Sequence, residues 1–436
     1  MKKNFFSLIF LLTTLSLGFT SCSEDETIPV LSAGFTTSAN VVEAGEAIEF
    51  TNSSTSATEY AWDFGDDVTS KDQNPEHTYA ADGKYTVTLV ATNGEKTEQF
   101  QTKVYVGEYA YVLNYGGYNG TKSSITLYDK KTASVPVFDY YNLRNNTIMT
   151  SNAQSAYQYG NKIYFMGNNV DRITYVDAAT FIQSNNGITD QVIKPRNCIA
   201  HDDILYVSCW GGEVWNDASI SYILKIDTKT DAVIGKIMLA GGPEDLEIAN
   251  GKLYAALNYD KKVAVIDMAS EAITYIDMPG VCSYITKDPS ENIFVSVVSS
   301  FSTPADQDGL AHINTQNDTY TMYPLSGISA AYVNVMAANT DFSKLYVMTS
   351  AYDSSWKLTG AVAVFDVASK AFESSNIVEG LFGINGIGVN NLNDDLNVFI
   401  SPSTTESGQI KVYSKDGVEK KSIGVGIAPM MLFDIE

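Results

Sequence analysis

Hydrophobic and polar residues alternate along much of this chain, which predicts strands and few helices. The alternation is clear over residues 47–51 and 85–91, and Gly, Asn and Asp separate the apolar runs. Tyr (27) and Phe (19) are abundant while charged residues make up only 18%, a balance that suits strands better than exposed helices. The 436 residues are enough for two or three domains. We therefore expect an all-β protein with more than one domain.

From residue 109 onward one unit recurs. It consists of an apolar strand, a tight turn of Asn, Asp or Gly, a second strand and, after a variable loop, a third strand that usually ends in Asp. Seven equivalent positions, 40 to 53 residues apart, mark the copies: Tyr111, Tyr164, Tyr206, Tyr254, Phe294, Tyr346 and Val398. Repeats of this length with several strands each predict the blades of a β-propeller.

The two ends of the repeat region are incomplete. The first copy lacks an upstream strand, and the apolar segment that begins at Pro429 has no partner strands of its own. We expect this C-terminal strand to complete the first blade, because closure of the ring would remove exposed sheet edges.

The N-terminus has the pattern of an export signal. Lys2 and Lys3 precede an apolar run over residues 5–19, which is short for a membrane span, and Cys22 follows small residues. This resembles a lipoprotein signal peptide over residues 1–21, with Cys22 as the lipidated residue. Residues 22–30 form an acidic linker. Its run Ser-Glu-Asp-Glu at 23–26 resembles the signal sending lipoproteins of Bacteroidetes to the outer face of the outer membrane. The alternative is a solvated linker without that role.

Three landmarks in residues 31–107 resemble the PKD domain, an Ig-like β-sandwich: Trp-Asp-Phe-Gly-Asp at 62–66, Asn-Pro-Glu-His-Thr-Tyr at 74–79 and Gly-Lys-Tyr-Thr-Val-Thr-Leu at 83–89. Trp62 and Tyr79 are expected in its core, since a small sandwich needs large inward side chains. Asp63, Asp66 and Asp67 either hold a calcium ion or cap a turn. Acidic residues outnumber basic ones here, so we expect a hydrated spacer that folds independently and is dispensable for ligand binding.

The repeats of residues 108–436 resemble the YncE-like seven-bladed β-propellers, and more closely the branch found among surface lipoproteins of Bacteroidetes. Strand pairs such as 252–254 with 263–267 carry this resemblance. It implies a seven-bladed β-propeller, and the BtuG-type members of this group capture cobalamin at the cell surface.

The loops after the second strands are rich in aromatic residues, and three of the four Trp residues lie in them. In a propeller these loops share one face with the loops that lead into the innermost strands. We predict a ligand-binding surface there, at the mouth of the central channel. Stacking would come from Tyr115, Tyr118, Trp210, Trp215, Tyr259, Tyr352 and Trp356, and hydrogen bonds from Asn114, Asn168, Arg196, Asn258 and Asn334. The alternative is that these rings pack on one another.

Further polar residues at the starts of the innermost strands are expected around the same mouth. Each has capping of a strand end as its alternative role. They are Asn152, Gln154, Asn197, Glu244, Asp245, Tyr284, Tyr332 and Asn385.

Signatures of catalysis are missing from the sequence. The three His residues are scattered, and no metal-binding spacing, phosphate loop or nucleophile elbow is visible. Glu244 and Asp245 are adjacent and should point different ways, which makes a poor acid–base pair. We expect no enzyme activity, no cofactor and, apart from the calcium alternative in the sandwich, no bound metal. The cysteines beyond Cys22 are expected to be buried thiols, with Cys198 facing about Tyr206 across a hairpin.

The formal net charge of −23 argues against nucleic acid as a partner. The expected function is capture of a ligand, above all a nutrient such as a corrinoid, for uptake through a TonB-dependent transporter. The lipid anchor would be the protein's contact with the membrane. The alternatives are a glycan-binding surface protein, a scaffold for protein–protein contact or adhesion, and a hydrolase or lyase. Corrinoids and glycans both favour aromatic, amide-rich loops, so the sequence leaves that choice open.

Overall fold

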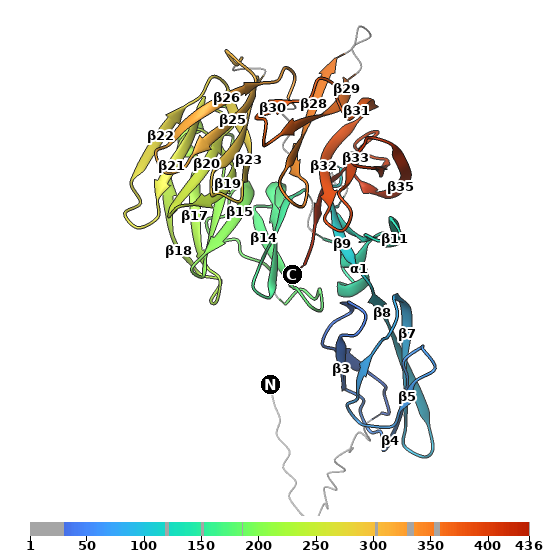
Figure 1. Cartoon of the computed structure of the whole chain (residues 1–436). Helices are drawn as coiled ribbons and strands as arrows, with labels where there is room; N and C mark the ends of the chain where they lie inside the picture. Colours follow the sequence, from blue (N-terminus) through green and yellow to red (C-terminus); the bar gives the residue numbers. More distant parts are fainter. Residues whose placement is uncertain are drawn as a thin grey trace, which may run out of the picture.

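The structure is a computed structural model that describes residues 30–117, 122–149, 152–184, 186–300, 304–328, 335–352 and 358–435, except for the side chains of residues 351, 352 and 358. A small sandwich (blue) and a large ring of sheets (green to red) are the two domains visible in Figure 1. The expected signal peptide, Cys22 and nearly all of the acidic linker lie outside the described residues. Within the described ranges, no helix is long and apolar enough to cross a membrane.

The first domain is a sandwich of two sheets, as predicted. One sheet has the order β1 (Phe35–Thr37), β3 (Ala47–Asn52), β6 (Glu76–Thr78), and the other β2 (Val41–Val42), β8 (Thr97–Val106), β7 (Gly83–Thr92), β4 (Glu59–Asp63), β5 (Thr69–Ser70). Trp62 and Tyr79 are each 1% exposed and belong to its core, as expected. The Trp62 indole donates to the carbonyl of Asp72 at 2.9 Å and the Tyr79 hydroxyl to that of Phe64 at 3.0 Å. The polar ends of both rings are thereby satisfied.

The Asp residues that follow Trp62 cap a turn. Asp63 accepts a hydrogen bond from the backbone N–H of Gly65 at 2.8 Å, and Asp66 accepts one from Val68 at 3.3 Å. The second oxygen of Asp66 lies 2.8 Å from Nε2 of His77. These contacts correspond to the turn-capping alternative for this cluster.

The second domain is a ring in which the described strands form seven sheets, the blades of a β-propeller. With the innermost strand first, blade 1 contains β36 (Pro429–Phe433), β9 (Tyr109–Asn114), β10 (Ser124–Asp129) and β11 (Ser134–Val137). Blade 2 contains β12 (Ala153–Tyr159), β13 (Lys162–Gly167) and β14 (Arg172–Asp177). Blade 3 contains β15 (Pro195–His201), β16 (Ile204–Cys209), β17 (Tyr222–Asp227) and β18 (Val233–Met238). Blade 4 contains β19 (Pro243–Ala249), β20 (Lys252–Leu257), β21 (Lys262–Asp267) and β22 (Ile273–Asp277); blade 5 contains β23 (Val281–Lys287), β24 (Ile293–Val298), β25 (Gly309–Asn314) and β26 (Thr319–Pro324).

Blade 6 contains β27 (Met336–Ala338), β28 (Lys344–Tyr352), β29 (Leu358–Asp366), β30 (Ala371–Phe372) and β31 (Val378–Phe382); blade 7 contains β32 (Ile384–Asn390), β33 (Asp395–Ile400), β34 (Ser407–Tyr413) and β35 (Glu419–Ile427). The outer edge of blade 6 is split, because β30 and β31 both pair with β29. Short helices occur at α1 (Tyr140–Asn145), η1 (Asn168–Val170) and η2 (Ala218–Ile220).

The ring closes through its C-terminal strand, as predicted. β36 pairs antiparallel with β9, with Phe433 opposite Tyr111. Apolar clusters of buried residues occupy the seams between successive blades all the way round. The last seam joins blade 7 to blade 1, where Phe399 packs in one cluster with Val112. Closure therefore leaves β9 paired on both sides.

The ring has two faces. The plain face carries the turns from first to second strand and from third to fourth strand. The loop face carries the loops from second to third strand and the connections that lead into the innermost strands. β9 begins on the plain face at Tyr109 and β36 ends there at Phe433, so the sandwich and the C-terminus both lie on the plain side. Figure 1 shows the sandwich extending from this side.

The sandwich is docked on the propeller instead of being joined by a free linker. Only Gly107 and Glu108 separate β8 from β9, and the N–H of Gly107 donates to the carbonyl of Val42 at 2.8 Å. Tyr105 of the sandwich is 1% exposed and belongs to the apolar cluster between blades 1 and 2. Its ring meets that of Tyr140 edge to face, with centroids 6.1 Å apart. The two domains thus share part of one core, which goes beyond the expected spacer.

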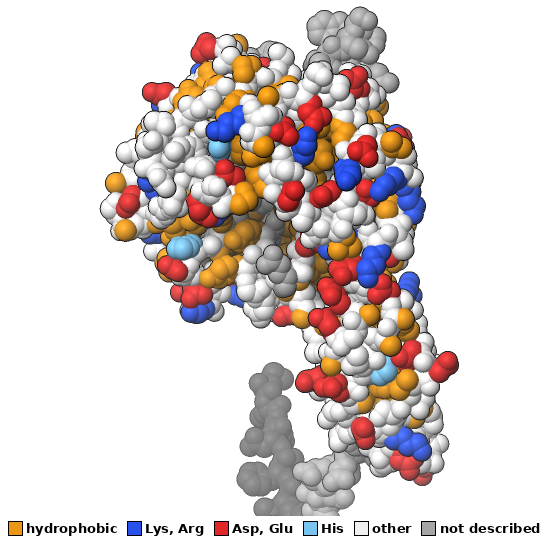
Figure 2. Space-filling model, in the orientation of Figure 1, with side chains coloured by type: hydrophobic (Ala, Val, Ile, Leu, Met, Phe, Trp, Pro, Cys, Tyr) orange, Lys and Arg blue, Asp and Glu red, His pale blue; other side chains and the backbone are white. Residues whose placement is uncertain are grey.

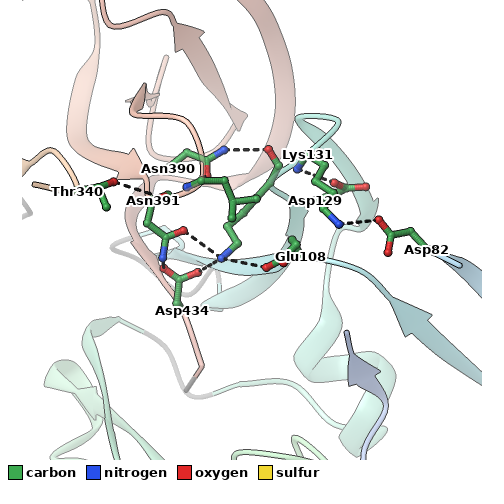
Figure 3. A network of polar contacts seen from close by, with 10 residues as sticks. Asp82, Glu108, Asp129, Lys131, Thr340, Asn390, Asn391 and Asp434 are labelled. Atoms are coloured by element: carbon green, nitrogen blue, oxygen red, sulfur yellow. Dashed lines mark hydrogen bonds and ion pairs between the residues drawn. The ribbon is translucent and has the colours of Figure 1, made fainter. Parts of the chain in front are cut away.

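A polar network reinforces this junction (Figure 3). Lys130, in the turn after β10, is 7% exposed. Its Nζ lies 2.9 Å from the carboxylate of Asp434 and 3.1 Å from the side-chain oxygen of Asn391. The neighbouring Lys131 pairs with Asp82 of the sandwich at 2.9 Å. Blade 1, blade 7, the C-terminal segment and the sandwich are therefore connected at one place.

The propeller cysteines are buried free thiols, as predicted. Cys198 lies opposite Val207 and not opposite Tyr206. The difference arises because the turn consists of two residues, Asp202 and Asp203, both with positive φ, which moves the register by one position.

The surface carries the excess of acidic residues that the net charge of −23 implies. Figure 2 shows Asp and Glu side chains spread over the visible face of both domains and not gathered into one patch. This distribution is typical of a solvated surface.

Candidate functional site

Four of the residues expected on the loop face cannot be placed. Tyr118, Tyr332, Asn334 and Trp356 lie outside the described residues, and the side chain of Tyr352 is not described. The site is therefore built from the residues over blades 1 to 5 and blade 7.

The loop after β16 holds its two Trp residues at different depths. Trp210 is 5% exposed, whereas Trp215 is 53% exposed. Their ring centroids lie 6.5 Å apart in an edge-to-face arrangement, and the Tyr259 ring packs edge-on against Trp210 at 5.4 Å. Three predicted aromatic side chains thus come together, as aromatic pairs of this geometry favour. Trp210 packs inside the cluster, and Trp215 is its outermost ring.

Close backbone approaches hold this loop in position. Gly211 has φ +74°, and a Cβ there would lie 2.3 Å from the carbonyl oxygen of Ile220. On the side of blade 4, a Cβ on Gly242 would lie 2.7 Å from the ring of Tyr259 and 3.1 Å from Val214. Only glycine fits such approaches without displacing the neighbours. The ring cluster is consequently fixed by the backbone on both sides.

Arg196 lies inside the protein against Trp210. It is 4% exposed, and its guanidinium carbon is 4.1 Å from the centre of the Trp210 ring. Nε and Nη2 donate to the carboxylate of Glu244 at 2.9 and 2.5 Å, and Nη1 donates to Gln154 at 3.0 Å. These hydrogen bonds connect the inner strands of blades 2, 3 and 4. Because these contacts hold the guanidinium inside, Arg196 acts as a support for the Trp210 ring.

A bulge recurs near the start of the inner strands. In β15 the register shifts between Pro195 and Cys198, and corresponding shifts occur in β12, β19, β23 and β32. In blade 3 the hydroxyl of Ser208 accepts a hydrogen bond from the N–H of Asn197 within the bulge at 3.0 Å. A bulge re-aims side chains and increases the local twist. In blades 3 and 4, the successive residues Arg196 and Asn197 contact the successive residues Glu244 and Asp245 in this way.

Glu244 and Asp245 bind different partners, in line with the prediction that they form no acid–base pair. Asp245 is 5% exposed and accepts the N–H groups of Leu246 and Ile285 at 2.9 Å each. Burial raises the pKa of Asp245 to about 7, and these two hydrogen bonds offset only part of that effect. Burial also raises the pKa of Glu244, although the charge of Arg196 lowers it in part.

The described asparagines at the ends of the second strands are buried. Asn114 is 0% exposed and donates to the hydroxyl of Thr126 at 2.9 Å. Asn168 donates to the carbonyl of Pro195 at 3.3 Å, and Asn258 is buried at the corresponding place in blade 4. Buried amides with internal partners stabilise a fold, which favours a structural role for Asn114 and Asn168. The side-chain nitrogen of Asn258 has no hydrogen-bond partner among the described residues.

The remaining predicted residues are spread around the mouth. Tyr115 is half-buried and packs against the cluster between blades 1 and 2. The side-chain oxygen of Asn152 accepts a hydrogen bond from Asn169 at 2.7 Å, and Asn385 donates to the carbonyl of Pro429 at 2.9 Å. These contacts are local and do not join the aromatic cluster of blades 3 and 4.

Two residues of the connection from blade 2 into blade 3 were missed by the sequence analysis: the half-buried Lys194, which lies beside Trp215, and the exposed Ile193. The Nζ of Lys194 lies 5.9 Å from the centre of the Trp215 ring, and Ile193 is 40% exposed. The carbonyl of Lys194 accepts the N–H of Trp210 at 3.2 Å, which ties this connection to the Trp loop. Residues in an irregular connection carry no periodic signal, so nothing in the sequence placed them here.

The described part of the chain contains no group of three or more His, Cys, Asp or Glu side chains that could hold a metal ion. His77 and His312 each pair with an Asp, at 2.8 and 3.0 Å. His201 is exposed on the plain face at the end of β15. These positions are far apart in the fold and do not form a common site.

Comparisons with known proteins agree with this architecture. Residues 27–106 match the family model of the PKD domain. A search of curated proteins gives no match to the sequence. Among solved structures, a quinonprotein alcohol dehydrogenase-like protein of Bacteroides thetaiotaomicron is similar with a TM-score of 0.56 and 15% identity, covering 95% of this chain and 98% of that one. A periplasmic gluconolactonase of Pseudomonas aeruginosa is similar with a TM-score of 0.56 and 12% identity, covering 76% and 100%. At these identities the likeness shows the fold and establishes no activity.

Proposed function

We propose that this protein is a non-enzymatic, lipid-anchored surface protein whose loop face captures a ligand. The observation that carries the proposal is the half-exposed Trp215 on a fixed base of buried groups. Trp210, Tyr259 and Arg196 lie beneath or beside it with internal partners. A large exposed ring on a rigid support offers contact area to a ligand and binds with little loss of conformational entropy.

The position of the sandwich supports the same function. It docks on the plain face and leaves the loop face of the described blades uncovered. Val30 accepts a hydrogen bond from Thr55 at the start of the sandwich, while Asn40, ten residues later, contacts Ala179 of the propeller. The chain therefore enters at the end of the sandwich away from the propeller. An anchor at Cys22 would hold the loop face away from the membrane.

The finer form of the proposal is capture of a corrinoid for a TonB-dependent transporter. A corrinoid is large, flat and rich in amides. It could stack on the Trp215 ring, with the cation of Lys194 beside it. A glycan with a flat sugar face would suit the same ring, so glycan capture is the rival ligand class. A protein scaffold is the remaining alternative.

Calorimetric titration separates these ligands. The chain from residue 23 onward, without the lipidated Cys22, is titrated with cyanocobalamin and with a panel of neutral oligosaccharides. We expect one class to bind, and Trp215→Ala to weaken it at least tenfold, which is about 1.4 kcal/mol. Tyr275→Ala is the matched control, because Tyr275 is a similarly exposed ring on the outer edge of blade 4. Binding unaffected by Trp215→Ala, or no binding of either class, would refute small-ligand capture at this face.

The anchor is tested in cells. Wild-type protein should incorporate a labelled fatty acid and be digested when intact cells are treated with protease. Cys22→Ala should remove the label. A labelled Cys22→Ala variant, or full protection of the wild-type protein, would contradict a surface-exposed lipoprotein.

A further inference from the structure

The blade seams on the plain face follow a repeated rule. In four seams, the turn between the third and fourth strands of one blade sends a side chain toward the marker tyrosine or a lysine of the preceding blade. In the seam between blades 4 and 5, Asp318 of this turn accepts a hydrogen bond from the Tyr254 hydroxyl at 2.7 Å. The other oxygen of Asp318 pairs with Lys252 at 2.7 Å. One carboxylate of blade 5 thus binds two side chains of blade 4.

Other seams use the same turn position. Asp231 of blade 3 pairs with Lys162 of blade 2 at 2.8 Å. In blade 2 the position is occupied by Phe181, whose ring stacks on Tyr111 of blade 1 at 5.2 Å. The equivalent residue has positive φ in all seven blades: Ala133, Phe181, Asp231, Glu271, Asp318, Lys370 and Gly417.

Blade 7 has no side chain at this position. Its residue at this position is Gly417, with φ +80°, and a Cβ there would lie 2.4 Å from the carbonyl oxygen of Ile377. Ile377 comes close because it belongs to the connection that splits the outer edge of blade 6. No side chain can therefore reach from this position toward Tyr346, the marker tyrosine of blade 6. A cleft of about 610 Å³ lies between blades 6 and 7 instead.

The hydroxyl of Tyr346 has no hydrogen-bond partner among the described residues, although the side chain is only 3% exposed and lines the cleft. Burial raises the pKa of Tyr346, and the nearby carboxylate of Asp394 raises it further. Lys344, which would need the missing carboxylate, pairs with Asp366 at 3.3 Å and with Glu373. The hydroxyl of Tyr164 also has no partner among the described residues, although Asp231 is present in its seam. What distinguishes Tyr346 is therefore the cleft that its side chain lines.

We propose that this cleft is a second binding site, which takes a hydroxyl-rich molecule of one or two sugar rings. The remaining lining is mostly polar and includes Asn339, Ser343, Asn376, Asp394, Lys415 and Asp416. A ligand hydroxyl both accepts and donates, so it can accept from Tyr346 and donate to Asp394 or Asp416. Carboxylates outnumber cations around the cleft, which disfavours an acidic sugar. The volume is within the range of small-molecule sites.

Saturation-transfer NMR on the chain from residue 23 onward tests the site, with D-galactose, N-acetyl-D-glucosamine and cellobiose as probes and D-glucuronate as the acidic counterpart. We expect transfer to at least one neutral sugar and none to D-glucuronate. Tyr346→Phe should weaken binding about five- to tenfold through loss of one hydrogen bond, and Asp416→Asn should weaken it less.

Tyr164→Phe is the matched control, because Tyr164 is the marker tyrosine of blade 2, and its buried hydroxyl also has no partner among the described residues. This variant should bind like the wild type and should melt like Tyr346→Phe. The site is independent of the loop face, so the difference between wild type and Tyr346→Phe should persist in a Trp215→Ala background even if capture at the loop face fails. Equal binding by Tyr346→Phe and wild type, or no transfer to any neutral sugar, would overturn the proposal.

Discussion

The two faces of the propeller use their buried side chains for different purposes. On the plain face, Lys130 and Tyr105 join the first blade, the C-terminal segment and the sandwich. On the loop face, Trp210 and Arg196 form a buried base under the half-exposed Trp215. The same blade repeat therefore supports assembly on one side and presentation of a ring on the other. Five changes test this difference, and they are given in order of decreasing effect.

Deletion of residues 428–436 should have the largest effect. It removes β36, leaves β9 as an open edge and uncovers Met430 and its apolar partners. We expect a loss of more than about 5 kcal/mol in the free energy of unfolding or loss of the cooperative transition in calorimetry. A chain shortened by its last residue alone is the control and should melt like the wild type. An unchanged melting temperature in the long deletion would mean that β36 does not close the ring.

Trp210→Ala should destabilise the loop face by about 3–5 kcal/mol, as expected for a large buried ring. The ring is 5% exposed and contacts both Arg196 and Tyr259, so its loss leaves a cavity above a buried ion pair. Denaturant unfolding measures the change. Trp210→Phe, which keeps an aromatic ring, should lose less. A fully stable Trp210→Ala variant would show that this base is not structural.

Tyr105→Ala should weaken the plain face by about 3 kcal/mol. It removes the ring that the sandwich inserts into the cluster between blades 1 and 2. In calorimetry the sandwich and the propeller should then unfold in more clearly separated transitions. Lys131→Ala, which breaks an exposed ion pair with Asp82, is the control and should change little. Identical traces for Tyr105→Ala and wild type would indicate that the domains are not coupled.

The buried carboxyl of Asp245 predicts a pH dependence. Its folded-state pKa is raised to about 7 by burial, above the value near 4 in an unfolded chain. Its stabilising contribution is complete below pH 4 and is lost as the pH rises through 7. Between pH 5 and pH 7 the loss should be about 2 kcal/mol. Asp245→Asn should flatten this part of the profile, and an unchanged slope in that variant would argue that Asp245 titrates normally.

Trp215→Ala should have the smallest effect on stability, within about 0.5 kcal/mol, because more than half of the ring is exposed. Comparing the free energies of unfolding of Trp215→Ala and Trp210→Ala tests which ring is a structural support and which is an exposed contact surface. If Trp215→Ala unfolds the loop face as Trp210→Ala does, the outer ring is packing and does not present a contact surface.

Much of the fold could be predicted from local features of the chain. The marker positions from Tyr111 to Val398 were enough to count the blades, since each blade repeats its own alternation within about 40 to 53 residues. The unpaired segment at Pro429 predicted closure. Trp62 and Tyr79 identified the sandwich core, because short motifs keep their order in the chain. The exact partner of Cys198 was missed by one position, since a two-residue turn is hard to place within a run of polar residues.

The candidate site depended on contacts that sequence does not encode locally. The sequence placed Trp210 and Trp215 in one loop and Arg196 near the channel mouth, but only packing against blade 4 decided that Trp210 and Arg196 are buried and Trp215 is exposed. The cleft at Tyr346 likewise follows from a glycine about 70 residues away and from the carbonyl of Ile377. Alternation and repeat length are properties of single segments and are read directly from the chain. Burial depth and seam filling are properties of pairs of segments, and they are decided only when the ring closes.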